Sequence, residues 1–262
     1  MPQKLFDSEF MQKLEYLTFI SRKIFRGRAR GQHQTYRKGS SLEFHDFRSY
    51  QPGDDFRYID WSIYSRLDKL FVKLFAAEED LMVQILIDRS GSMESGTPWK
   101  LAYAKKVAAA LSYIALLNLD RVGGAAFATE IGPVLPPFRR RGANSIFEFY
   151  ENITAEGETG FSKALTSFSS ASKRPGLAIV ISDLLDPDGY KDGLLSLLYN
   201  KYDVILIQVL SEEEIDPPIK GAYEFADAET GRKLKVTLEP PVIEAYRNRL
   251  TEYLRDIETF RI

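Results

Sequence analysis

Residues that suit a hard metal ion occur together where an apolar run ends. The run from Leu81 to Ile87 stops at Asp88, and Ser90 and Ser92 follow at alternate positions. This order puts one carboxylate and two hydroxyl groups directly after an expected buried strand. Mg2+ and Mn2+ prefer oxygen ligands, and Mg2+ keeps several waters beside a few protein oxygens. The pattern therefore predicts a divalent-cation loop at this strand end.

Two further oxygen donors follow other parts of the chain. Asp183 comes directly after the apolar run from Leu177 to Ser182, just as Asp88 follows its own run. Thr159 lies in a Gly-Glu-Thr-Gly loop before an expected helix. Ligands of α/β proteins collect outside the carboxyl ends of parallel strands, so we expect these loops to meet at one cation. With only two carboxylates in the set, that cation stays under-neutralised, which favours binding of an acidic partner.

The elements that position these residues alternate along the chain. From about Leu81 onward, near-continuous apolar runs alternate with amphipathic stretches, which is typical of a parallel sheet with helices on both faces. A turn signal at Glu229-Thr230-Gly231 predicts a hairpin able to extend the sheet edge, followed by a helix from about Pro241. The strands are predicted at 81–87, 122–128, 131–135, 177–182 and 204–210, and the other helices at 99–117, 145–152, 162–170 and 190–199.

The predicted fold class is α/β, with a doubly wound, mostly parallel sheet and an additional N-terminal α+β segment. We expect two parts, residues 1–80 and residues 81–262. The first part holds a helix around 9–25, a basic loop and an aromatic and acidic stretch. The second part holds the sheet, the hairpin and the C-terminal helix.

Composition excludes several classes of function. The 35 basic and 37 acidic residues nearly cancel, so no overall field favours nucleic acid. Cysteine is absent and only His33 and His45 are present, which leaves almost nothing for a conventional zinc site. The stretch from Arg22 to Lys38 has seven basic and no acidic residues, and we interpret it as a solvated arm. No apolar run approaches the roughly 20 residues of a membrane helix, so we expect no membrane insertion and a cytoplasmic location.

Two other interpretations use the same loop. A Mg2+-dependent phosphohydrolase could use Asp88 as nucleophile and Asp183 as a metal ligand. Phosphatases of the haloacid dehalogenase type usually carry a second aspartate two positions on, where this chain has Ser90. In the structural alternative, Ser90 and Ser92 cap the following helix while Asp88 accepts backbone hydrogen bonds. We prefer metal binding because Thr159 and Asp183 add two further oxygen donors to those of the Asp88 loop.

The same residues resemble a known adhesion site. Asp88-Arg89-Ser90-Gly91-Ser92, Thr159 and Asp183 resemble the five elements of the metal-ion-dependent adhesion site of von Willebrand factor A domains. The resemblance implies that Asp88, Ser90, Ser92 and Thr159 ligate or orient the ion directly or through water, and that Asp183 acts chiefly through water. It also implies that an aspartate or glutamate of a partner completes the coordination shell.

A second resemblance covers nearly the whole chain. The segment from Leu42 to Trp61, with its Gln51-Pro52-Gly53-Asp54 turn, resembles the MoxR-associated bacterial family, whose biochemical function is not settled. That family carries this segment ahead of a von Willebrand A-like domain, and its genes typically lie beside one for a MoxR-type AAA+ ATPase. The resemblance implies an adaptor or chaperone-like factor that works with such an ATPase or its client protein. We therefore predict a metal-dependent protein–protein interaction module and not an enzyme.

Overall fold

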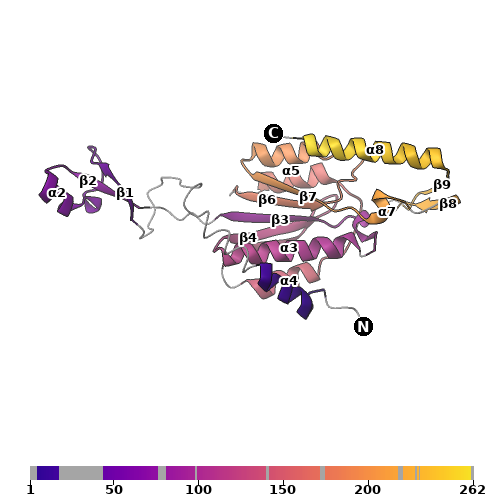
Figure 1. The fold of residues 1–262 in the computed structure, drawn as a ribbon, viewed down its shortest axis with the longest axis horizontal. Helices are drawn as coiled ribbons and strands as arrows, with labels where there is room; N and C mark the ends of the chain where they lie inside the picture. Colours follow the sequence, from indigo (N-terminus) through magenta and orange to yellow (C-terminus); the bar gives the residue numbers. More distant parts are fainter. Residues whose placement is uncertain are drawn as a thin grey trace. The chain divides into compact units, whose positions relative to one another are not determined.

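The computed structural model describes residues 5–17, 44–75, 81–97, 99–139, 142–171, 175–217, 221–227, 229 and 231–260. The basic stretch from Arg22 to Lys38, and residues 18–25 of the predicted N-terminal helix, lie outside these residues. The chain divides into two compact units (Figure 1). We call residues 1–18 and 81–262 the α/β unit, and residues 19–80 the small unit.

The α/β unit is built on a five-stranded sheet with the strand order β5-β4-β3-β6-β7. Strands β4, β3, β6 and β7 are parallel, and β5 pairs antiparallel with β4. The bounds are β3 Met82–Asp88, β4 Arg121–Phe127, β5 Ile131–Phe138, β6 Leu177–Ser182 and β7 Asp203–Gln208. Each predicted strand overlaps an observed one, and the predicted α/β class with a mostly parallel sheet is confirmed.

Helices cover both faces of this sheet (Figure 1). Helices α3 and α4 pack on one face, and α5, α6 and α8 pack on the other. Two short helices, η2 and α7, follow the strands β3 and β7. The bounds are η2 Gly91–Glu94, α3 Lys100–Leu117, α4 Ala143–Glu151, α5 Phe161–Ala171, α6 Lys191–Tyr199, α7 Glu212–Ile215 and α8 Pro240–Thr259.

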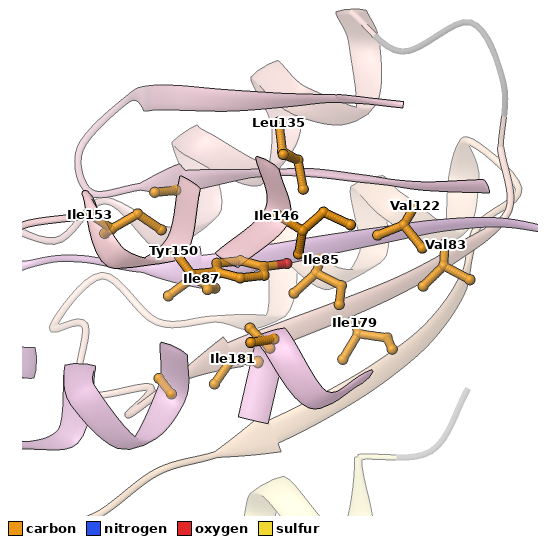
Figure 2. Close-up of a cluster of buried hydrophobic side chains, with 14 of the residues drawn as sticks. Val83, Ile85, Ile87, Val122, Leu135, Ile146, Tyr150, Ile153, Ile179 and Ile181 are labelled. Atoms are coloured by element: carbon orange, nitrogen blue, oxygen red, sulfur yellow. The ribbon is translucent and has the colours of Figure 1, made fainter. Parts of the chain in front are cut away.

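Strand β3 is apolar along its length because both of its faces are covered. All of its residues are buried, and successive side chains point to opposite faces of a sheet. Ile85 and Ile87 therefore join the core under α3 and α4, whereas Leu86 joins the core under α5 and α6. Figure 2 shows Ile146 and Tyr150 of α4 within the first of these cores. This arrangement fixes the carboxyl end of β3, where Asp88 lies.

The predicted hairpin and C-terminal helix are both present. Strands β8 (Gly221–Ala226) and β9 (Lys233–Leu238) pair antiparallel, and α8 begins at Pro240. The hairpin forms a two-stranded sheet of its own, so the expectation that it extends the central sheet is wrong. All six residues of β8 are exposed, which shows that this strand contributes little to the core.

The helix formed by residues 8–17 belongs to the α/β unit. The ring centroid of Phe6 lies 5.1 Å from that of Phe147 in α4 and 5.3 Å from that of Phe10. Leu14 is only 1% exposed. The sequence grouped this helix with residues 1–80, whereas in the structure its apolar side chains pack on the first core.

The small unit pairs β1 (Phe44–Ser49) antiparallel with β2 (Phe71–Phe75). Between them lie η1 (Phe56–Tyr58) and α2 (Trp61–Leu67). The carboxylate of Asp60 accepts hydrogen bonds from the backbone at the start of α2 and pairs with Lys73 at 2.9 Å. Two further ion pairs of this unit are separate from it, Arg48–Asp54 at 2.8 Å and Arg57–Asp55 at 2.7 Å.

Candidate functional site

Asp88 ends β3 with its carboxylate buried inside the protein. The residue is 1% exposed. Its Oδ1 accepts a hydrogen bond from the backbone N–H of Ser90 at 2.9 Å, and its Oδ2 accepts one from the hydroxyl of Ser182 at 2.6 Å. Ser182 ends β6, the strand beside β3. Two neighbouring strand ends therefore hold this carboxylate in one orientation.

The electrostatic state of Asp88 is unusual for an aspartate. Burial, and after it the charge of Asp183, raises the pKa of Asp88 from 3.8 to about 6. The hydrogen bonds from Ser182 and Ser90 act in the opposite direction but do not cancel the burial. Within the part of the chain that the structure describes, no lysine, arginine or histidine forms an ion pair with Asp88. A bound cation would supply the missing positive charge.

The side-chain oxygens of Ser90, Ser92 and Asp183 lie next to one another beside Asp88. The hydroxyl oxygens of Ser90 and Ser92 lie 3.1 Å apart. The hydroxyl of Ser92 donates to Oδ2 of Asp183 at 2.8 Å. Ser90 is fully buried and Asp183 is 2% exposed. The structure thus brings four of the five predicted site residues together through direct hydrogen bonds.

Thr159 lies in a loop that is attached to the Asp88 loop by backbone hydrogen bonds. The N–H of Gly91 donates to the carbonyl of Gly157 at 2.9 Å, and the N–H of Glu156 donates to the carbonyl of Arg89 at 2.7 Å. Thr159 itself is half-buried, and its backbone N–H donates to Oε2 of Glu229 at 2.8 Å. Among the described residues, Thr159 makes no hydrogen bond to the other four predicted site residues.

Lys100 is the site residue that sequence reasoning missed. It begins α3, is 1% exposed, and donates from Nζ to Oδ2 of Asp183 at 2.7 Å and to Oε1 of Glu214 at 2.5 Å. Glu214 belongs to α7, whose capping box it forms with Ser211. Buried charges are rarely stable unless they are paired, so this ammonium group compensates Asp183 and leaves Asp88 without a cation. The sequence shows only a lysine at an expected helix start, which gives no signal of burial.

The side chains at this strand edge fit a hard divalent cation in their chemistry. Carboxylate oxygens from Asp88 and Asp183 and hydroxyl oxygens from Ser90 and Ser92 are the donors that Mg2+ and Mn2+ prefer. No group of three or more histidine, cysteine, aspartate or glutamate side chains arranged for a metal occurs in the described ranges. A cation at this edge would therefore depend on two carboxylates, on hydroxyl groups and on water.

The fold places this chain among α/β proteins with a mostly parallel central sheet flanked by helices. Residues 46–256 match the model of DUF58, a protein family of unknown function, and the chain belongs to this family. An uncharacterized protein of Mycobacterium tuberculosis (strain ATCC 25618 / H37Rv), Rv1480, is 24% identical over 258 residues, which cover 96% of this chain and 81% of that protein. Mb1516, an uncharacterized protein of Mycobacterium bovis, has the same identity and coverage.

Solved structures to which this chain is similar include one described as von Willebrand factor type A. The conserved hypothetical protein BatB from Bacteroides thetaiotaomicron has a TM-score of 0.46 and 21% identity, and the match covers 64% of this chain and 85% of that one. A von Willebrand factor type A protein from Catenulispora acidiphila has a TM-score of 0.37 and 20% identity, and the match covers 51% of this chain and 34% of that one.

The cytoplasmic location expected from the sequence is contradicted by two further structural neighbours. One is an aerotolerance-related membrane protein from Bacteroides fragilis, at a TM-score of 0.44 and 20% identity over 64% of this chain and 87% of that one. The other is an uncharacterized membrane spanning protein from Vibrio fischeri, with a TM-score of 0.27 and 17% identity. This match covers 70% of this chain and 99% of that one. None of the helices in the described part of this chain is long and apolar enough to cross a membrane.

Proposed function

We propose that this protein is a metal-dependent protein–protein interaction module. Asp88, Ser90, Ser92, Thr159 and Asp183 would hold Mg2+ or Mn2+, directly or through water, at the carboxyl edge of the sheet. A bound divalent cation would supply a Lewis-acidic position for one carboxylate oxygen of an aspartate or glutamate on a partner. We also propose that the sheet has the doubly wound arrangement of von Willebrand A domains, and that these five residues form the adhesion site of those domains.

One observation carries the proposal. The carboxylate of Asp88 is 1% exposed, has no cationic partner among the described residues, and is joined through Ser90 and Ser92 to a second buried carboxylate. An isolated buried carboxylate costs several kcal/mol, so a site that retains one is suited to gain a cation. The proposal rests on two facts together, the sequence motif after β3 and the position of Asp183 beside it at the end of β6.

The balance of charge supports an acidic partner. Lys100 lies 2.7 Å from Oδ2 of Asp183 and compensates that carboxylate. Of the two carboxylates among the proposed ligands, Asp88 is then the one without a cation of its own among the described residues. Because Asp88 contributes about one negative charge, a divalent ion beside it would keep about one positive charge, which attracts another anion. The residues of this chain thus leave the ion's remaining charge for the partner to neutralise.

The orientation of Asp88 argues against an enzyme. A nucleophilic aspartate needs one oxygen free to reach the substrate. Both carboxylate oxygens of Asp88 accept hydrogen bonds, from the N–H of Ser90 and the hydroxyl of Ser182, and the side chain is buried. These contacts favour a residue that holds a ligand in place over the nucleophile of a phosphohydrolase.

The MoxR-associated resemblance supports the choice of partner. In this proposal the protein acts as an adaptor or chaperone-like factor, and a MoxR-type AAA+ ATPase, or the client of that ATPase, is bound through an acidic residue. The ATPase would perform the mechanical work, and this protein would provide recognition.

A titration of the purified full chain with Mn2+, followed by electron paramagnetic resonance, tests the cation site. We expect saturable binding that is lost in Asp88→Ala and retained in Asp203→Ala. Asp203 is a suitable control because it is an exposed aspartate at the first position of β7, the opposite end of the strand from the site. Equal Mn2+ binding by the Asp88→Ala variant would refute the assignment of the ligands.

The same variants test the role in recognition. Purified protein would be mixed with the purified MoxR-type ATPase from the same cell, in Mg2+ and in EDTA, and complex formation measured by size-exclusion chromatography. The proposal expects a complex that requires both Mg2+ and Asp88. A complex that persists in EDTA and in Asp88→Ala would show that the cation does not mediate this contact.

A further inference from the structure

A groove opens beside the candidate cation site. It lies between the loop after η2, helix α7, the hairpin β8–β9 and the first turns of α8, and its volume is about 710 Å3. Figure 1 shows α7 next to this hairpin and to the start of α8. We call this space the hairpin groove. Its apolar lining consists of Phe225, Val236, Leu238, Val242, Ile243 and Tyr246.

The apolar wall of the hairpin groove is open to solvent. Phe225 is 42% exposed, Val242 is 43% exposed and Tyr246 is 41% exposed. These side chains come from a strand and a helix that are adjacent only in the folded protein. Covering apolar surface is favourable by about 25 cal/mol for each Å2 that is removed from water. The groove therefore offers binding energy that the described residues leave unused.

Among the residues that the structure describes, the charged groups that line the groove are acidic. They are Glu213 and Glu214 of α7, and no described lysine or arginine lines it. Glu214 is engaged by Lys100, whereas Glu213 is exposed and forms no ion pair with any residue that the structure describes. An occupant with apolar groups and a neighbouring positive charge is complementary to both features.

Residues that line the groove contact residues of the candidate cation site. Ser95, which lines the groove, donates from its hydroxyl to the carbonyl of Ser92 at 2.6 Å. Glu214 accepts the hydrogen bond from Lys100, whose ammonium group also donates to Asp183. One residue, Ser95, thus connects the groove to Ser92, and two residues, Glu214 and Lys100, connect it to Asp183.

We infer that the hairpin groove binds a segment of a partner protein in which large apolar side chains adjoin a lysine or arginine. The apolar side chains occupy the wall formed by β8, β9 and α8, and the basic side chain pairs with Glu213. This contact goes beyond the proposed function because it requires no cation. A partner that also places an acidic residue on a cation bound beside Asp88 gains both contacts, and a short connection between the two makes the binding stronger than either alone.

The test begins with a display library of short random peptides, selected on the purified full chain in EDTA. We expect enrichment of peptides that combine Leu, Ile, Phe or Tyr with Lys or Arg. Enrichment of acidic peptides without a basic residue would overturn the inference, and so would a failure to enrich any peptide, because the library samples the predicted composition.

Binding of the selected peptides is then measured by fluorescence anisotropy on variants of the groove. Val242→Lys and Glu213→Lys should each weaken binding by about tenfold or more, because one removes apolar contact and adds repulsion while the other reverses the complementary charge. Leu195→Lys and Glu252→Lys are matched controls, since these residues are exposed, lie outside the groove and change the net charge equally. Circular dichroism checks that all four variants are folded.

The outcomes separate this inference from the proposed function. Peptide binding that survives in EDTA and in Asp88→Ala, but not in the groove variants, supports the groove whatever the cation does. Binding that is the same in Val242→Lys as in Leu195→Lys refutes the groove, and it leaves the Mn2+ titration as an independent test of the cation site.

Discussion

Replacing Asp88 by asparagine should stabilise the protein when no divalent cation is present. Asparagine has nearly the same shape, and its carbonyl oxygen can accept the hydrogen bond from the N–H of Ser90. Its amide group can donate to the hydroxyl of Ser182, which in the native protein donates to Asp88 and accepts a hydrogen bond from the N–H of Leu184. The substitution therefore removes a buried charge and keeps the contacts to Ser90 and Ser182, but it reverses the second hydrogen bond and takes from the buried hydroxyl of Ser182 the acceptor that Asp88 provides.

The size of the effect follows from the pKa of Asp88. Folding raises this pKa from 3.8 to about 6. Because the folded pKa lies above the unfolded one, the folded state holds the proton more tightly, and stability is lost as the pH rises through the folded pKa. Each pKa unit corresponds to about 1.4 kcal/mol. Ionised Asp88 therefore costs about 3 kcal/mol near neutral pH and about half of that near pH 5.

Urea unfolding in EDTA, followed by far-ultraviolet circular dichroism, measures this difference. We expect Asp88→Asn to raise the free energy of unfolding by about 1 to 2 kcal/mol near neutral pH, which is the cost of the ionised carboxylate less the cost of the acceptor that the hydroxyl of Ser182 loses, with a smaller gain near pH 5. Added Mg2+ should stabilise the native protein and leave the variant unchanged. A variant that is less stable than the native protein in EDTA would show that Asp88 carries no uncompensated charge, and the reasoning would fail.

Three further substitutions test the packing around the site by urea unfolding. Lys100→Met should cost about 3–5 kcal/mol because it leaves buried carboxylates unpaired, whereas the same change at the exposed Lys163 should cost less than about 1 kcal/mol; equal costs would contradict the pairing. Tyr150→Phe should cost about 1–3 kcal/mol because the buried hydroxyl of Ser112, 2.7 Å from that of Tyr150, loses its partner. A cost below that of an exposed Tyr→Phe change would argue against the bond. Gly124→Ala should prevent folding, since a Cβ there would lie 2.0 Å from the carbonyl oxygen of Ile85, and a soluble, cooperatively unfolding variant would contradict this close strand contact.

Much of the fold is encoded in local patterns of the sequence. A run such as Leu81 to Ile87 has no polar face, because the strand it forms is covered by helices on both sides. The alternation of such runs with amphipathic stretches is sufficient to predict a mostly parallel sheet. The turn at Glu229 likewise predicts the hairpin that the structure contains.

The sequence did not predict which parts of the fold the N-terminal helix and the hairpin pack against. The helix of residues 8–17 and the preceding Phe6 join the α/β unit, where Phe6 and Phe10 pack on the first core, and the hairpin forms its own small sheet. Neither result follows from local pattern, because an apolar helix face or strand does not specify which distant surface will cover it. The compartment was also misjudged, since the absence of a long apolar run does not decide where a protein is located.

The sequence by itself determined which residues stand at the ends of β3 and β6, and therefore that Asp88, Ser90, Ser92 and Asp183 could meet. The carboxyl ends of parallel strands lie at the same edge of a sheet, so this part of the site follows from the predicted parallel sheet, whereas the pairing of β3 with β6 is a result of the tertiary structure. Only the tertiary structure decided that Lys100 is buried against Asp183 and Glu214, and that Asp88 is left without a cation among the described residues. Burial and charge compensation depend on how loops that are far apart in the sequence pack together, and residue types alone do not specify that packing.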